Sequence, residues 1–146
     1  MTRTLTLVFD GGSRGNPGEG YGSYLLDFGG GNGLRSGRSS RLAPSQVVRL
    51  RLGDRMTNNE AEYDTLIAAL EALLAELQRA GEKPQSFALE VRGDSQLVMR
   101  QLTGEWRTHE PRLAQRRDKA RRLLSRFARY QLVHQPRAAS LALLGH

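Results

Sequence analysis

The chain has 146 residues, of which 38% are hydrophobic, and a formal net charge of +7. This length and composition fit one domain with an ordinary core and exclude a disordered chain. No apolar run approaches the roughly 20 residues of a membrane-spanning helix, and the N-terminus is too strand-like for a secretory signal. The chain has no cysteine, which excludes disulfides and thiolate metal sites and fits a cytoplasmic protein.

The first half of the chain predicts three strands before any helix, over residues 4–9, 20–27 and within 46–52. The first of them alternates polar and apolar residues and ends at Asp10. The glycine-rich stretch 11–18 predicts the turn of a hairpin, and 28–36 predicts a connection. Three successive strands favour an antiparallel meander.

The second half alternates helices with strands. The clearest helix covers residues 58–80, where apolar side chains recur at helical spacing; Thr57 or Asn58 can cap its start and Gly81 ends it. The remaining elements are expected as strand, helix, helix, strand and a short final helix, over residues 87–91, 95–102, 111–129, 130–133 and 137–144. This order predicts one α/β domain over residues 1–146, a mixed sheet flanked by helices.

Basic residues crowd the last third of the chain, where only Glu110 and Asp118 oppose them. The basic residues are Arg107, Arg112, Arg116, Arg117, Lys119, Arg121, Arg122, Arg126, Arg129 and Arg137. Such asymmetry favours a polyanionic partner whose phosphates meet one basic face. Many of these residues belong to the helix expected over residues 111–129, and its other faces are expected to be merely solvated. Trp106, just before this helix, is expected to be a packing anchor.

Three acidic residues lie where the predicted elements can bring them together. Asp10 ends the first strand, Asp94 follows the fourth, and Glu62 lies in the first turns of the long helix, on the sheet side. Asp64 and Glu71 are expected to face solvent. Carboxylates without cysteine suit magnesium or manganese, and two such ions support phosphoryl displacement. On spacing alone, three unrelated surface acids remain the alternative.

The residues around these acids form three motifs, Phe9–Gly18, Thr57–Tyr63 and Gly93–Val98. In order and spacing they resemble the type 1 ribonuclease H family, over nearly the whole chain. The resemblance implies the ribonuclease H-like fold, a five-stranded mixed sheet whose first three strands are antiparallel. It also implies a monomeric, metal-dependent endonuclease that hydrolyses the RNA strand of RNA–DNA hybrids by a two-metal-ion mechanism.

The resemblance implies a role for each motif residue. Asp10 would bind both Mg²⁺ or Mn²⁺ ions, Glu62 the ion near the RNA strand, and Asp94 the ion that positions the attacking water. His134 matches a loop histidine that assists proton transfer or product release, with an ordinary loop histidine as the alternative. The residues that match substrate contacts are Gly11, Gly12, Ser13, Asn16, Asn58, Asn59 and Gln96. Amide side chains can meet a 2′-hydroxyl or a base edge, and the asparagines before Glu60 can also cap the helix.

The sequence departs from the family in its last motif. Counting from either His134 or the Pro136-Arg137 pair places the family's fourth carboxylate at Leu144, and no acidic residue follows Asp118. The resemblance therefore implies a weakened second metal site and a shortened final helix. One alternative is a weakened or inactive module that binds hybrid or structured nucleic acid. Another is a resolvase-like or transposase-like strand cutter, against which the motif at residues 58–62 argues.

Overall fold

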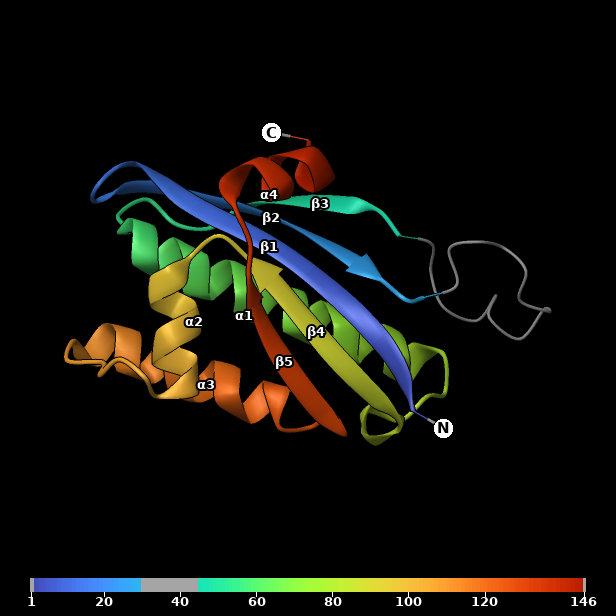
Figure 1. Ribbon diagram of the computed structural model, residues 1–146. Helices are drawn as coiled ribbons and strands as arrows, with labels where there is room; N and C mark the ends of the chain where they lie inside the picture. Colours follow the sequence, from blue (N-terminus) through green and yellow to red (C-terminus); the bar gives the residue numbers. More distant parts are fainter. Residues whose placement is uncertain (1, 30–44, 146) are drawn as a thin grey trace.

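The computed structural model describes residues 2–29 and 45–145, and it shows a five-stranded sheet with helices on both faces (Figure 1). The elements are β1 (Arg3–Gly15), β2 (Gly18–Asp27), β3 (Val47–Arg51), α1 (Asn58–Arg79), the 3₁₀ turn η2 (Pro84–Ser86), β4 (Phe87–Gly93), α2 (Gln96–Thr103), α3 (Pro111–Leu124), β5 (Arg129–His134) and α4 (Arg137–Leu144). The strand order is β3-β2-β1-β4-β5. The first three strands are antiparallel, whereas β1, β4 and β5 are parallel to one another. The predicted fold class is confirmed.

The main core lies between the sheet and α1. Leu5 and Leu7 of β1 are fully buried, as are Leu66 and Leu70 of α1, so the apolar stripe of the helix faces the strand residues that alternate inward. α3 packs beside α1 on this face, and the shorter α4 lies on the other face, over β1 and β2 (Figure 1). Within the described residues, no helix is long and apolar enough to cross a membrane.

A reciprocal cap fixes the start of α1. Thr57 Oγ1 accepts from the Glu60 amide at 3.1 Å, and the Thr57 amide donates to Glu60 Oε1 at 2.9 Å. Such a cap stabilises a helix by about 1 kcal/mol. Thr57 is therefore the N-cap, and the side chain of Asn58 is available for other contacts.

The hairpin between β1 and β2 is longer than the sequence predicts. β1 continues through Gly15, so residues 11–15 are strand rather than turn. The glycines here serve close packing: a Cβ on Gly11 would lie 2.6 Å from the carbonyl oxygen of Ala61 on α1. The stretch predicted as a turn is therefore the part of the strand against which α1 packs.

The predicted end of α3 also differs from the structure. α3 ends at Leu124 instead of residue 129, because the chain turns there and buries Phe127 in the core, while the Ala128 amide donates to the Phe87 carbonyl. The final helix covers the predicted residues 137–144. Part of the predicted connection, residues 30–36, lies outside the described residues.

Ion pairs with α1 hold α3 in place. Arg116 Nε lies 2.8 Å from Asp64 Oδ1, and Arg116 Nη1 lies 3.4 Å from Glu60 Oε2. Lys119 Nζ lies 3.3 Å from Glu71 Oε2. Part of the basic charge expected to face phosphates is thus used to pair the two helices. Glu71 is exposed as predicted, with 53% of its side chain accessible, whereas Asp64 is partly buried, with 31% accessible, in its pair with Arg116.

Another arginine of α3 caps a neighbouring helix. Arg121 donates to the carbonyl oxygens of Leu102 and Gln101, both at 3.1 Å, at the C-terminal end of α2. The Gln101 carbonyl also accepts from the Gly104 amide at 3.2 Å, and a cation at this end of the helix complements the helix dipole. Trp106 is 43% exposed with the Arg100 guanidinium 5.5 Å from its ring centroid, so it is a surface residue rather than the expected packing anchor.

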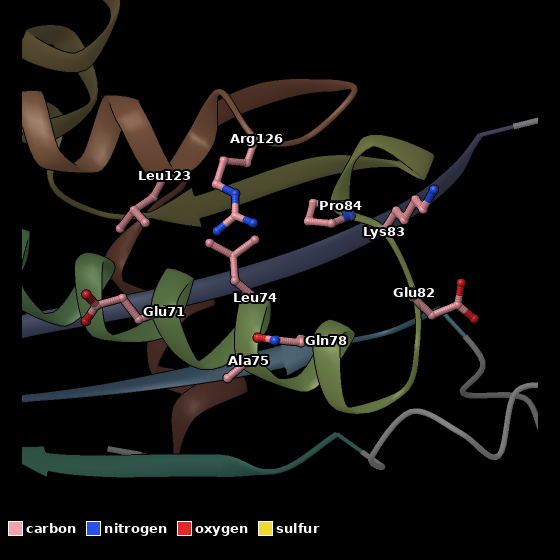
Figure 2. A pocket seen from close by; sticks show the side chains of 9 residues that line it. All are labelled: Glu71, Leu74, Ala75, Gln78, Glu82, Lys83, Pro84, Leu123 and Arg126. Atoms are coloured by element: carbon pink, nitrogen blue, oxygen red, sulfur yellow. The ribbon is translucent and has the colours of Figure 1, made fainter.

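The C-terminal halves of α1 and α3 border a groove of about 610 Å³ (Figure 2). Leu74 and Leu123 line it together with residues of both charge signs, such as Glu71 and Arg126. Its α1 residues begin nine positions after Glu62, which is about 13 Å along a helix. The groove is therefore separate from the acidic residues described next.

Candidate active site

The fold brings the three predicted carboxylates together beside the C-terminal end of β4; Asp10 lies within β1, which continues to Gly15, so the prediction that Asp10 ends the first strand was wrong. Phe9 of β1 pairs with Gly93 of β4 in parallel register, so Asp10 and Asp94 both come one position later. The close approach of α1 to Gly11 places Glu62 beside them. Glu62 Oε1 accepts a hydrogen bond from the hydroxyl of Ser95, the residue after Asp94, at 3.0 Å.

Burial and charge together act on Glu62. They raise its pKa from 4.5 to about 7, with burial the largest cause and the negative charges of Asp94 and Asp10 adding to it. The Ser95 hydrogen bond and the charge of Arg137 lower the pKa in part. Asp10 and Asp94 are thus close enough to oppose the ionisation of Glu62, and a cation between the three side chains would relieve this repulsion.

An arginine lies against two of these acids. Arg137, the first residue of α4, places Nη1 3.3 Å from Asp94 Oδ2 and 4.0 Å from Asp10 Oδ1. The sequence predicts Arg137 as part of the basic surface, and its place beside the acids was not predicted. Its position directly after the last strand, at the start of a helix, was the available signal.

His134 lies at the rim of the same cluster. It ends β5, and its Nε2 is 3.2 Å from the carbonyl oxygen of Asp94. The next residue fixes the chain here, because the Gln135 amide donates to the Gly93 carbonyl at 2.9 Å. The side chain is exposed, so it can exchange protons with solvent.

The tip of the β1–β2 hairpin is tied to the start of α1 by predicted substrate residues. The Ser13 amide and hydroxyl donate to Asn58 Oδ1 at 2.8 and 3.0 Å, and the Asn58 amide donates to Asn16 Oδ1 at 3.1 Å. These bonds orient both side-chain amides, with the oxygens toward the protein. Within residues 2–29 and 45–145, neither NH₂ group has an assigned acceptor. The paired asparagines therefore present hydrogen-bond donors.

The remaining predicted substrate residues lie around this region with less specific contacts. Gly12 packs internally, since a Cβ there would lie 2.8 Å from the Tyr21 hydroxyl. Asn59 is partly buried in the first turn of α1. Gln96 begins α2, and in the orientation that satisfies its neighbours its carbonyl accepts from Arg100 Nε at 2.9 Å. A substrate contact at each of these residues stays a prediction.

Leu144 lies on the same side of the sheet as Asp10. Asp10, Ser23 and Arg49 pair across three strands and form one row. Arg49 Nη2 donates to the Leu144 carbonyl at 3.2 Å, while Arg137, at the other end of α4, lies by Asp10. α4 thus crosses the sheet over this row, and the Leu144 side chain is fully buried.

The carboxylate oxygens of Asp10, Glu62 and Asp94 suit a hard cation, but the side chains are not arranged as a complete coordination site. Carboxylate oxygens are the preferred ligands of magnesium and manganese. Among the described residues, no three His, Cys, Asp or Glu side chains are already arranged around one point that could hold a metal. The three acids lie near one another with Arg137 on two of them, and α4 adds no acidic side chain.

Comparison with known proteins gives the family. Residues 45–142 match the family described as "Reverse transcriptase-like". The chain is 42% identical over 135 residues to ribonuclease HI of Halobacterium salinarum, covering 90% of this chain and 56% of that protein. It is 36% identical over 135 residues to the "Bifunctional protein Rv2228c" of Mycobacterium tuberculosis, covering 92% of this chain and 32% of that protein. The chain thus spans about half and one third of the length of these relatives.

Solved structures agree in fold. RNase H1 from Halobacterium salinarum superposes with a TM-score of 0.73 at 38% identity, covering 94% of this chain and 89% of that chain. LC11-RNase H1, solved in complex with an RNA/DNA hybrid, gives 0.75 at 28% identity, with coverage of 94% and 89%. A mixed sheet with acidic side chains grouped beside the end of its central parallel strand β4 defines a ribonuclease H-like domain. The chain belongs to the type 1 ribonuclease H family.

Proposed function

We propose that this protein is an endonuclease that hydrolyses the RNA strand of RNA–DNA hybrids with the help of divalent metal ions. The observation that carries the proposal is that Asp10, Glu62 and Asp94 lie near one another beside the end of β4, and the register of β1 and β4 and the Ser95–Glu62 hydrogen bond support it. The likeness to LC11-RNase H1, which was solved with a hybrid, supports the substrate.

Asp10, Glu62 and Asp94 would hold two Mg²⁺ or Mn²⁺ ions, with Asp10 shared. Such ions activate a water and stabilise the leaving oxygen when they are bound. The chain itself sets the conditions for binding: because the pKa of Glu62 is about 7, a cation must displace a proton from part of the molecules at neutral pH. The Leu144 side chain supplies no oxygen ligand, so a water would complete the coordination of the ion near Asp94. That ion would therefore bind more weakly.

We propose that Asn16 and Asn58, whose side-chain amides are oriented by hydrogen bonds, bind the substrate. With their oxygens held by the protein, Asn16 and Asn58 offer NH₂ groups to acceptor atoms. A 2′-hydroxyl oxygen, a phosphate oxygen and the minor-groove acceptors of the bases are all such atoms. We infer that this surface meets the hybrid on its minor-groove side. His134, exposed beside Asp94, would carry a proton to or from solvent.

A second function has one observation in its favour. The buried apolar Leu144 occupies the face of the sheet on which Asp10 lies, where the resemblance implies a carboxylate. A protein that binds hybrid or structured nucleic acid and no longer cuts it would show the same sheet and asparagines.

We also expect the protein to be a monomer and to act in the cytoplasm. Light scattering measures the oligomeric state, and cell fractionation measures the localisation.

The test compares four end-labelled substrates of one sequence: RNA–DNA hybrid, double-stranded DNA, double-stranded RNA and single-stranded RNA. Each is incubated with Mg²⁺ or Mn²⁺ and with the unmodified protein, Asp10→Asn, or the control Asp54→Asn, whose side chain is 89% exposed. We expect cleavage of the RNA strand of the hybrid, lost in Asp10→Asn and kept in the control. Cutting of double-stranded DNA would contradict the proposed substrate, and hybrid binding without cutting would favour the second function.

A further inference from the structure

The hydroxyl of Ser95 links α2 to the acidic cluster. Ser95 is the N-cap of α2 and is 6% exposed. Its Oγ accepts from the Val98 amide at 3.3 Å and donates to Glu62 Oε1 at 3.0 Å. Within the part of the chain that the structure describes, this is the assigned hydrogen bond of the Glu62 carboxylate, and it leaves Oε2 open.

The two hydrogen bonds of Ser95 depend on each other. The backbone of Ser95 is held in the capping conformation, with φ −88° and ψ 96°, and its carbonyl accepts from the Met99 amide at 3.2 Å. The helix amide takes a lone pair of the hydroxyl, so the hydroxyl proton is free to point at Glu62. A hydroxyl group can accept and donate at one atom, whereas a carboxylate can only accept.

Charge explains why Glu62 needs such a donor. Asp10 and Asp94 both act on Glu62 with like charge. Glu62 also has a flexible side chain and is only half-buried, so repulsion would drive an unrestrained carboxylate toward solvent. A donor fixed by a helix cap opposes that movement.

We propose that Ser95 is the positioning residue of Glu62: it holds Oε1 against the start of α2 and leaves Oε2 as the oxygen offered to a metal ion. The inference rests on the proposed function only for what Glu62 binds. Residues that orient a metal ligand by hydrogen bonding typically change metal affinity by about 10- to 100-fold when removed.

Three substitutions at Ser95 separate positioning from capping. Ser95→Ala removes both hydrogen bonds. Ser95→Gly removes the hydroxyl but costs a helix cap only about a few tenths of a kcal/mol, so its stability should stay close to that of the unmodified protein. Ser95→Thr keeps the hydroxyl. Ser125→Ala is the matched control, because Ser125 is exposed and its hydroxyl donates to the Arg122 carbonyl at the end of α3.

The experiment is titration of Mn²⁺ by calorimetry, beside urea unfolding of each variant. We expect Ser95→Ala and Ser95→Gly to weaken Mn²⁺ binding about tenfold, and Ser95→Thr and Ser125→Ala to bind as the unmodified protein does. We also expect Ser95→Ala to add nothing to Glu62→Gln in the double variant, because both act on one contact. Unchanged Mn²⁺ binding in Ser95→Ala and Ser95→Gly, additive effects in the double variant, or no Mn²⁺ binding by the unmodified protein would overturn the inference.

Hybrid cleavage measured on the same samples keeps the two proposals apart. If the unmodified protein cuts hybrid while the Ser95 variants bind Mn²⁺ normally, the role of Ser95 is refuted and the nuclease function stands. If Mn²⁺ binding follows the expected pattern while no sample cuts hybrid, the role of Ser95 stands and the nuclease function is refuted.

Discussion

Arg137 Nη1 lies 3.3 Å from Asp94 Oδ2, so the first residue of α4 places a positive charge on a carboxylate that the proposed function assigns to metal binding. An arginine and a divalent ion at one carboxylate compete for the same charge. Because the Arg137 side chain is 65% exposed, the competition is modest.

Replacing Arg137 should therefore strengthen metal binding. An exposed ion pair contributes up to about 1 kcal/mol, which corresponds to an increase in Mg²⁺ affinity of up to about fivefold in Arg137→Gln. Calorimetric titration measures it, with Arg129→Gln as the control because Arg129 is an exposed arginine at the opposite end of β5. A weaker affinity in Arg137→Gln would mean that the arginine supports the ion instead of competing with it.

An aspartate in place of Leu144 should make the stability of the fold depend on metal binding. Leu144 is fully buried, so Leu144→Asp without metal should lose about 2 to 5 kcal/mol of stability through the cavity and the buried charge. If the position faces the ions, Mg²⁺ should restore more stability in this variant than in the unmodified protein, and the metal affinity should rise. Thermal melts with and without Mg²⁺ measure it.

The neighbouring Leu143 provides the control for this prediction. Leu143 is 42% exposed, so Leu143→Asp should change stability little and should show no extra response to Mg²⁺. An equal Mg²⁺ response in both variants would show that Leu144 does not face the ions.

The pKa of Glu62 gives a pH dependence with a definite sign. The pKa rises from 4.5 to about 7 on folding, so the folded protein without metal binds this proton more tightly than the unfolded chain. This contribution to stability is complete below pH 4.5 and is lost as the pH rises through about 7. Glu62→Gln, which cannot ionise, should raise the melting temperature at pH 8 and change it little at pH 4.

The same proton competes with metal at Glu62. Mg²⁺ affinity of the unmodified protein should therefore increase between about pH 6 and pH 8, the range around the raised pKa. For the stability prediction, the contradicting result is a change in melting temperature, relative to the unmodified protein, that is the same for Glu62→Gln at pH 4 and at pH 8. Such a result would argue against a raised pKa of Glu62.

Reversing the polarity of Asn58 should separate substrate binding from folding. Asn58→Asp still accepts from Ser13, so the hairpin should stay tied to α1, but the outward donor becomes an acceptor with negative charge. Hybrid affinity should fall by at least about tenfold, since a charged hydrogen-bond partner is worth 1.5 kcal/mol or more. Fluorescence anisotropy in Ca²⁺ measures it, and normal hybrid binding with normal stability would contradict a contact at Asn58.

The arginines of α3 should divide into two groups. Arg116 pairs with Asp64 and Glu60, and the Glu60 side chain is 6% exposed, so Arg116→Gln should lower the free energy of unfolding by about 1 to 3 kcal/mol. Arg122→Gln, which removes an arginine with no ion pair assigned in the described residues, should leave stability unchanged. Urea unfolding distinguishes them, and equal effects would refute the clamp between α1 and α3.

The sequence predicted the order of elements because each carries a local signal. The apolar stripe of α1 and the alternation in β1 specify helix and strand without knowledge of the rest of the chain. The hairpin turn lies within the predicted residues 11–18 but covers only residues 16 and 17. The prediction was too long because glycine has two uses: it permits tight turns, and it permits a helix to approach a strand. Only the position of Ala61 against Gly11 shows which use applies.

The site was predictable where it depends on strand ends and family motifs, and not where it depends on side-chain direction. Glu62 and Asp94 follow from element boundaries, whereas Asp10 lies within β1 and was found through its motif. The sequence shows that α4 begins near Arg137 and α2 near Ser95, but not that these side chains point toward Asp94 and Glu62.

The most direct test of the central claim is the rate of RNA-strand cleavage in an end-labelled hybrid as Mg²⁺ or Mn²⁺ is varied, with protein in excess over substrate. We expect Asp10, Glu62 and Asp94 to suffice: cleavage should rise with metal concentration to a plateau, and Asp10→Asn should abolish it. Intact hybrid binding with no cleavage at any metal concentration would contradict it and would indicate a nucleic-acid-binding module.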